Sequence, residues 1–267
     1  MIATLSTIST GIPAVDAMMG GGLPRRHLTE LYGPADCGKT TIALNWIAAA
    51  QRCAHTAVYV DAERKFDAKW AGLCGVHLED LVLVQPDNGS QALAMAESLM
   101  RTFTVDLLVI DSIAALAPDS EELPFADDGQ LDAHTELVTR TLRKLRHIAE
   151  RACTALVAVN QMRSRLRPGM PETSSAGRAL GLHSAIRLRV RREGNEIRFS
   201  SIKNRLADPF QDACVLLDGA RIVEAPQRSP IPEGWRPEPM TSSPRFNVAT
   251  DSGPGKRVPA YRVAKTG

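Results

Sequence analysis

"GPADCGKT", residues 33–40, has the spacing of a phosphate-binding loop: a glycine, four residues, then glycine, lysine and threonine. An apolar run (28–32) precedes it and a sequence typical of a helix (40–53) follows it. This order of strand, loop and helix is the context that supports the motif. Gly33 and Gly38 let backbone amides turn toward phosphate oxygens beside the positive end of the helix dipole. The stretch therefore predicts a nucleoside triphosphate site.

The residue types predict a role for each side chain around the triphosphate. Lys39 is expected to reach the β- and γ-phosphates, and the Thr40 hydroxyl to ligate Mg²⁺. A second metal ligand is Asp111, which ends the apolar run "DLLVIDS" (106–112), because open α/β sheets bind ligands at the carboxyl ends of their strands. The residues predicted to contact the nucleotide in the loop are Gly33, Pro34, Ala35, Asp36, Cys37, Gly38, Lys39, Thr40 and Thr41.

Polar residues end two further apolar runs. "VYVDAE" ends with Asp61 and Glu63, and a carboxylate there could orient or deprotonate the water that attacks the γ-phosphate. Spacing alone leaves this role and a solvated surface carboxylate equally open. "TALVAVNQ" ends with Asn160 and Gln161, where an amide could donate a hydrogen bond to the γ-phosphate and transmit its loss to the basic segment that follows.

Apolar runs alternate with helical sequences through the first two thirds of the chain, which predicts an α/β fold with a largely parallel central sheet and helices on both faces. Two antiparallel strands are expected around Gly194 and Asn195, and another short pair over 214–223. Residues 225–267 contain eight of the 17 prolines and little apolar material. We therefore predict an ATPase-type core over 1–224 and a disordered tail over 225–267.

The composition, 44% hydrophobic and 23% charged, is that of a globular protein, and no run approaches the roughly 18 apolar residues of a membrane helix. Five scattered cysteines and no evident secretory leader predict reduced thiols in the cytoplasm. Charge is unevenly distributed: 106–132 holds eight acidic and no basic residues, whereas 163–205 holds eleven basic and three acidic ones. Charge alone leaves a polyanionic partner and a solvated basic β-surface equally open.

Ordered segments along about residues 8–224 resemble the RecA family of recombinases in one register. The segments are "ISTGIPAVDAMMGGGLP", "YGPADCGKTT", "VDAERKFDAKW", "QPDNGSQAL", "VDLLVIDSIAALAP", "NQMR", "PETSSAGRAL" and "IKNRLADPF". The resemblance implies a RecA-like ATPase that uses ATP and Mg²⁺ and forms a homo-oligomeric filament on single-stranded DNA. It further implies pairing with homologous double-stranded DNA and strand exchange in recombination and repair.

The resemblance also implies roles for individual residues. Glu63 matches the catalytic glutamate and Gln161 the γ-phosphate sensor. Asp67 and Trp70 match the adenine contacts, with core filling as the alternative for Trp70. The cations that would enter the ATP site of the neighbouring copy, and so complete a catalytic set with Lys39, are Lys203 and Arg205.

Two loops, over about 117–131 and 162–178, match the DNA-binding loops of the family, which favours a nucleic-acid partner for the basic segment. The implied DNA contacts are Leu131, Thr139, Arg143, Arg163, Arg165, Leu166, Arg167, Gly177 and Arg178.

The chain also departs from the family pattern. We expect the N-terminal docking helix and the C-terminal domain of the family to be absent, and Leu182 stands where an interprotomer phenylalanine is usual. These departures support a second hypothesis, an accessory protein that binds ATP and DNA and modulates another recombinase or translesion synthesis. Cys37 replaces the usual serine, either as a near-isostere or as a thiol whose pKa the helix N-terminus lowers.

Overall fold

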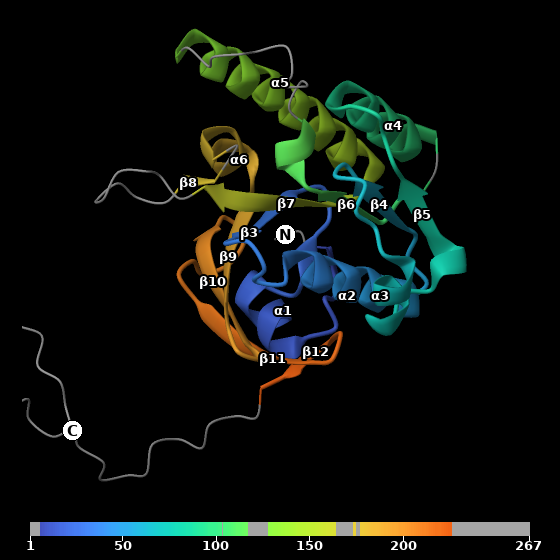
Figure 1. Ribbon diagram of the computed structural model, residues 1–267, viewed down its shortest axis with the longest axis vertical. Helices are drawn as coiled ribbons and strands as arrows, with labels where there is room; N and C mark the ends of the chain where they lie inside the picture. Colours follow the sequence, from blue (N-terminus) through green and yellow to red (C-terminus); the bar gives the residue numbers. More distant parts are fainter. Residues whose placement is uncertain (1–5, 103, 117–127, 164–172, 175–176, 226–267) are drawn as a thin grey trace, which may run out of the picture. The chain divides into compact units, whose positions relative to one another are not determined.

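The computed structural model describes residues 6–102, 104–116, 128–163, 173–174 and 177–225 (Figure 1). The predicted tail beyond residue 225 and most of the two predicted DNA-binding loops lie outside these residues, so both remain predictions.

A single large sheet organises the described part of the chain, in the strand order β12-β11-β10-β9-β3-β7-β6-β4-β5. The strands that pair in parallel are β9 (Ile186–Glu193), β3 (Leu28–Gly33), β7 (Ala155–Arg163), β6 (Leu107–Asp111), β4 (Ala57–Asp61) and β5 (Leu81–Val84). The antiparallel extension consists of β10 (Glu196–Asn204), β11 (Asp212–Asp218) and β12 (Arg221–Glu224), and the short β8 (Thr173–Ser174) pairs with the end of β7. The predicted α/β class with an antiparallel extension is confirmed.

Helices cover both faces of the sheet, as predicted (Figure 1). One face carries α1 (Pro13–Met19), α2 (Lys39–Arg52) and α3 (Ala68–Leu73), and the other carries α4 (Gly89–Thr102), α5 (Asp128–Ala152) and α6 (Gly177–His183). The alternation of side chains along a strand explains the two layers. In β6, Leu107 and Val109 join the first core and Leu108 and Ile110 join the second.

Among the described residues, no helix combines the length and the apolar character that crossing a membrane requires.

The structure contains several short elements that the sequence analysis did not predict. They are β1 (Thr7–Ile8), β2 (Leu23–Pro24), α1, α6 and the 3₁₀ turns η1 (Leu78–Asp80) and η2 (Ile113–Leu116). They span too few residues for periodicity to reveal them. For α1 the boundary residues were nevertheless informative. Pro13 occupies the first turn, and Gly20 ends the helix in the left-handed conformation with φ 86°.

The antiparallel hairpin β9–β10 packs its apolar side on α2. Phe199 of β10 is fully buried and stacks on Trp46 of α2, with ring centroids 6.4 Å apart. Because α2 begins at the phosphate-binding loop, this contact holds the helix that follows the loop against the hairpin. The tip of the hairpin turns at Gly194, where φ is 58°, as the Gly194–Asn195 prediction requires.

We expect Phe199→Ala to lower the free energy of unfolding by about 3–5 kcal/mol, because it leaves a cavity against Trp46. Phe210→Ala is the matched control, since Phe210 is 79% exposed, and should change it by less than about 0.5 kcal/mol. Urea unfolding of both variants measures the difference. Equal losses would contradict the packing described here.

Candidate nucleotide-binding site

A close contact at Gly33 and a left-handed backbone at Gly38 explain the two glycines of the phosphate-binding loop. A Cβ at Gly33 would overlap the Val190 carbonyl oxygen of β9 and would lie 2.8 Å from the Cys37 sulfur. Gly38 caps α2 in the left-handed conformation, with φ 88°. The loop therefore joins β3 to α2 as predicted, and β9 packs closely against its first residue.

The predicted metal ligands lie side by side. The Thr40 hydroxyl donates to Asp111 Oδ2 over 2.7 Å, and the Tyr59 hydroxyl donates to the same oxygen over 2.9 Å. Burial raises the pKa of Asp111 above its usual value, although these two donors and Lys39 oppose the change. Burial disfavours the ionised form of Asp111, and a cation bound beside it would stabilise that form.

This donor set fits Mg²⁺ bound together with phosphate. A hydroxyl and one carboxylate are oxygen ligands, and Mg²⁺ commonly completes its shell with substrate phosphates and water. No group of three His, Cys, Asp or Glu side chains in the described ranges could hold a metal by itself. Lys39, only 8% exposed, lies beside these residues and donates to the Pro34 carbonyl over 2.5 Å.

Glu63 and Gln161 lie at the same sheet edge and contact each other. Gln161 Nε2 donates to Glu63 Oε1 over 3.1 Å, and the Ser112 hydroxyl donates to the same oxygen. Lys65 Nζ donates to Glu63 Oε2 over 2.7 Å. Burial acts to raise the pKa of Glu63, but the hydrogen bonds from Lys65, Ser112 and Gln161 outweigh it and hold the pKa below its usual value. Glu63 is therefore an ionised carboxylate at neutral pH.

The structure separates the two carboxylates that spacing could not. Asp61 is 2% exposed and accepts hydrogen bonds from the backbone amides of Lys65 and Phe66, over 3.0 and 2.8 Å, and from Gln85 Nε2 over 3.0 Å. Asp61 thus closes the loop after β4, whereas Glu63 faces Ser112 and Gln161. Of the pair, only Glu63 is positioned to act on a ligand at this edge.

The two adjacent amides divide in the same way. Asn160 is fully buried and donates to Glu30 Oε1 over 3.0 Å, and Glu30 also accepts from the Arg187 guanidinium of β9. The guanidinium carbon lies 4.9 Å from the centre of the Tyr32 ring. This buried network joins β3, β7 and β9. The sequence analysis missed it, although a glutamate inside the apolar run "LTELYG" was an indication.

Of the implied adenine contacts, Trp70 reaches the start of α2 and Asp67 lies at the start of α3. The Trp70 indole donates to the Thr41 hydroxyl over 3.1 Å, and Asp67 caps α3 by accepting from the Trp70 amide over 3.0 Å. Trp70 is half-buried against the core. Trp70 therefore has a structural partner next to the loop and Asp67 has one within α3, and the adenine contact itself remains a prediction.

Lys203 and Arg205 lie away from the loop of their own chain. In the β9–β10 register Lys203 pairs with Arg187, near the amino end of β9, whereas the carboxyl end of β9 lies beside the loop. Lys203 Nζ donates to the Gly181 carbonyl over 2.6 Å, and burial, followed by the charges of Arg205 and Arg187, lowers the pKa of Lys203. Any action of these cations on ATP therefore requires another copy of the chain.

The implied DNA contacts are only partly described. Thr139 and Arg143 lie one helical turn apart on α5, and Arg143 is exposed. Burial, then Arg146 and Arg143, lowers the pKa of His183, so Arg143 faces α6. The backbones of Leu131, Arg163, Gly177 and Arg178 belong to α5, β7 and α6, while Arg165, Leu166 and Arg167 lie outside the described residues.

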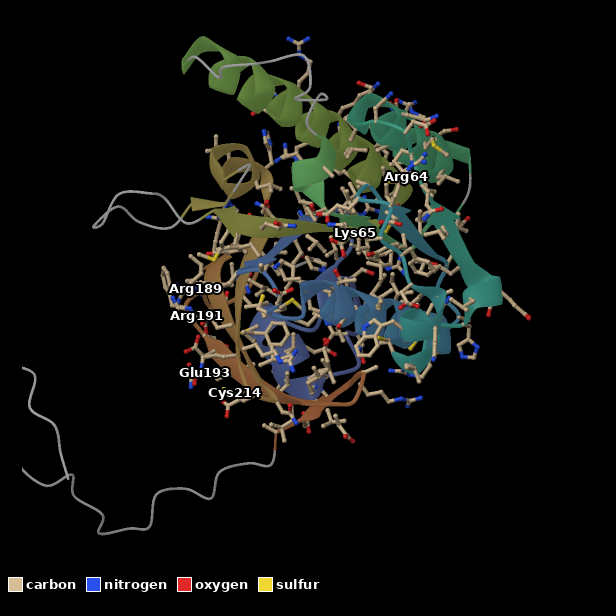
Figure 2. The ribbon with its side chains drawn as sticks, viewed as in Figure 1. Arg64, Lys65, Arg189, Arg191, Glu193 and Cys214 are labelled. Carbon is tan, nitrogen blue, oxygen red and sulfur yellow. The ribbon has the colours of Figure 1, made fainter. Side chains whose placement is uncertain are left out.

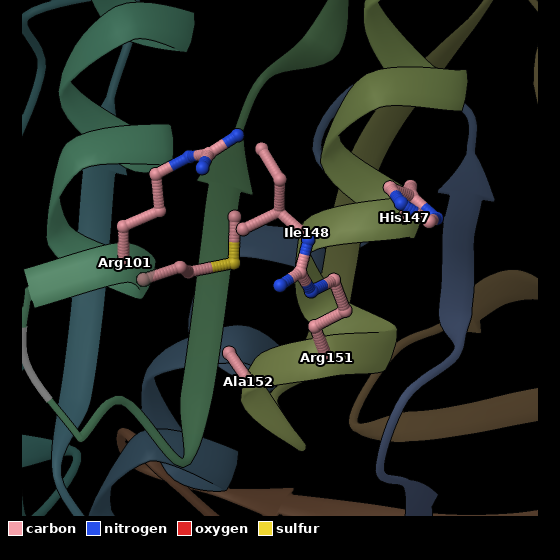
Figure 3. Close-up of a pocket in the computed structure, with 6 residues that line it drawn as sticks. Arg101, His147, Ile148, Arg151 and Ala152 are labelled. Carbon is pink, nitrogen blue, oxygen red and sulfur yellow. The ribbon is translucent and has the colours of Figure 1, made fainter.

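Two cavities border these elements. One, of about 550 Å³, separates residues 34–37 of the loop from residues 191–194 at the hairpin tip, where Figure 2 labels Arg191 and Glu193. The other, of about 330 Å³, lies between the ends of α4 and α5 (Figure 3) and is lined by Met100, Arg101, His147, Ile148, Arg151 and Ala152. None of the predicted site residues lines this second cavity.

Burial decides between the interpretations of Cys37. The side chain is 4% exposed, and this burial raises the pKa of the thiol despite the Lys39 ammonium 3.8 Å away. The hypothesis of a lowered pKa at the helix N-terminus is therefore wrong, and the near-isostere of serine is the interpretation that agrees with the structure.

Comparison with known proteins shows which family the sequence of this chain matches. The family model described as the RecA N-terminal domain matches residues 2–219. Proteins named Protein RecA are 40% identical in Oceanobacillus iheyensis (over 225 residues, 79% of this chain), 40% in Gluconobacter oxydans (over 219 residues, 77%) and 42% in Aquifex aeolicus (over 222 residues, 78%). The matched part of the chain spans 64–65% of the length of these three relatives.

The different partners of the two carboxylates predict different losses. Asp61→Asn should lower the free energy of unfolding by about 1–3 kcal/mol, because it weakens the hydrogen bonds that close the loop. Glu63→Gln should lower it by less than about 1 kcal/mol, because the partner in its ion pair, Lys65, is 76% exposed. Urea unfolding measures both, and a larger loss in Glu63→Gln would reverse the assignment.

Proposed function

The chain belongs to the RecA family, and from this premise we propose that it is a DNA-dependent ATPase that binds single-stranded DNA as an oligomer. It would promote homologous pairing and strand exchange in recombination and repair. The observation that carries the proposal is the convergence of Lys39, Thr40, Asp111, Glu63 and Gln161 at one edge of the sheet.

In the proposed hydrolysis, one set of residues binds ATP and Mg²⁺ and another activates the attacking water. The loop amides and Lys39 would bind the β- and γ-phosphates of ATP, and Thr40 and Asp111 would hold Mg²⁺. When bound there, Mg²⁺ supplies positive charge that offsets the charge of the phosphates. Glu63, an ionised carboxylate held by Ser112 and Gln161, would orient the attacking water and accept its proton.

A direct contact connects hydrolysis with DNA affinity in this proposal. Gln161 donates to Glu63 and ends the apolar part of β7, and the basic segment 162–178 follows it immediately in the chain. A change in the contacts of Gln161 when the γ-phosphate leaves would therefore alter the start of a segment that we expect to bind DNA.

Assembly is part of the proposal because the proposed catalytic residues lie at opposite ends of the strands. Lys203 and Arg205 lie at the level of Arg187, away from the loop of the same chain. Cations at this place would act on the ATP of a neighbouring copy, as arginine-finger groups do in trans. Turnover should then depend on protein concentration.

The test is ATP hydrolysis with and without single-stranded DNA over a range of protein concentrations. We expect stimulation by DNA that rises cooperatively with protein and is reduced by about 10²-fold or more in Glu63→Gln, the loss typical of a missing general base. Nucleotide binding without DNA-stimulated turnover would contradict the proposal and support the accessory protein that modulates another recombinase.

Binding to single-stranded DNA should weaken with salt. If about four cations of the basic loop contact phosphates, the logarithm of the association constant should fall with the logarithm of salt concentration with a slope near −3. Arg143→Gln should make the slope less steep by about 0.7, and Arg101→Gln, an exposed cation of α4, should leave it unchanged. Fluorescence anisotropy measures the slopes, and a slope near zero would remove the electrostatic part of the proposal.

A further inference from the structure

Lys65 is the one cation that pairs with Glu63 in the described part of the chain. It lies in the loop between β4 and α3 (Figure 2), and its ammonium donates to Glu63 Oε2 over 2.7 Å. The Lys65 side chain is 76% exposed, whereas that of Glu63 is 20% exposed. Of the other ionisable groups nearby, Tyr59, Asp61 and Asp111 are buried and carry no positive charge. Lys39 is buried at the phosphate-binding loop, where it donates to the Pro34 carbonyl.

The donors around Glu63 differ in how firmly they are held. Ser112 is fully buried after β6, and Gln161 belongs to β7, so the two donors to Oε1 are fixed by the sheet. Among the described residues Lys65 alone donates to Oε2, and it reaches that oxygen on a long, exposed side chain. Ion pairs of this exposed kind contribute little and exchange with water easily.

The backbone that carries Lys65 is itself restrained. The Lys65 amide donates to the buried Asp61 carboxylate over 3.0 Å. Arg64, with φ 53°, donates to the Pro86 carbonyl over 3.0 Å and pairs with Asp87. Because the chain on both sides is held, the Lys65 side chain can move without a rearrangement of the loop.

We propose that Lys65 is a positioning residue that restrains Glu63: its ammonium occupies Oε2 and must leave before that oxygen can accept a hydrogen bond from the attacking water. The proposal rests on the proposed function of Glu63 as the group that activates water. It assigns Lys65 a negative effect on turnover in the absence of DNA. When the ammonium leaves, Oε2 is free to accept a hydrogen bond from water, and the Glu63 carboxylate becomes more basic.

The electrostatics agree with this geometry. The hydrogen bond from Lys65 is the largest of the effects that lower the pKa of Glu63, and it opposes burial, which raises the pKa. A general base of lower pKa accepts a proton less readily. The same ion pair therefore blocks one oxygen and weakens the carboxylate as a base.

The experiment compares Lys65→Met, which removes the charge but keeps much of the side-chain length, with the wild type. Without DNA, kcat should rise roughly three- to tenfold, because the general base becomes more basic and Oε2 becomes available to the attacking water. KM for ATP should stay unchanged, because Lys65 makes no hydrogen bond to the phosphate-binding loop. Stimulation by DNA should fall by a similar factor.

Two further variants separate this effect from a general loss of charge. Lys65→Arg keeps a cation and should raise kcat less than Lys65→Met does. Lys69→Met removes an exposed lysine four residues along, in α3, that has no hydrogen bond or ion pair within the described ranges, and should leave kcat unchanged. Equal effects of Lys65→Met and Lys69→Met would overturn the proposal, as would an unchanged or lower kcat in Lys65→Met.

A carboxyl titration tests the ion pair without turnover. In protein labelled with carbon-13 at glutamate carboxyls, with the Glu63 resonance assigned from Glu63→Gln, Lys65→Met should raise the pKa of Glu63. An unchanged pKa would overturn the proposal. If the wild-type protein hydrolyses no ATP, the proposed function fails, and this titration still decides whether Lys65 holds the carboxylate.

Discussion

The parallel register of four adjacent strands is the constraint on which the site depends. In β3 and β7 it places Gly33 opposite Gln161, and in β4 and β6 it places Asp61 opposite Asp111. β7, β4 and β6 each bring a polar side chain to the edge where β3 enters the phosphate-binding loop, although these residues are far apart in sequence. A shift of one residue in any pair would turn the buried apolar side chains to the wrong face, so core packing and site geometry are set together.

Burial then divides similar side chains between support and chemistry. Asp61, Glu30 and Asn160 are almost inaccessible. Asp61 and Glu30 accept hydrogen bonds from specific donors, and Asn160 donates to Glu30 and accepts from the Gln161 amide, so these buried polar groups are satisfied. Glu63 keeps a partly exposed carboxylate whose partners include the exposed ammonium of Lys65. Neighbouring residues in the sequence thus have different roles because their side chains meet different partners: Asp61 accepts from the amides of the loop after β4, whereas Glu63 contacts Ser112 and Gln161.

The buried network around Glu30 links the parts of the molecule that the proposed mechanism uses. Glu30 belongs to the strand that enters the phosphate-binding loop, Asn160 precedes Gln161, and Arg187 lies in the hairpin strand beside Lys203. One carboxylate thereby holds three neighbouring strands in a common position. Removing a single partner would leave a buried charge uncompensated, so the three strands behave as one unit.

The sequence alone determined the α/β class, the phosphate-binding loop and the side chains Lys39, Thr40 and Asp111, because local spacing and strand ends carry this information. It also indicated the hairpin at Gly194, and it missed α1, α6 and the two-residue strands, which are too short to show a period. The family resemblance already singled out Glu63 and Gln161, but only the tertiary structure showed the hydrogen-bond partners that separate them from Asp61 and Asn160. It also revealed the Glu30 network and decided between the two interpretations of Cys37. The physical reason is that burial and hydrogen-bond partners come from strands that are distant in sequence.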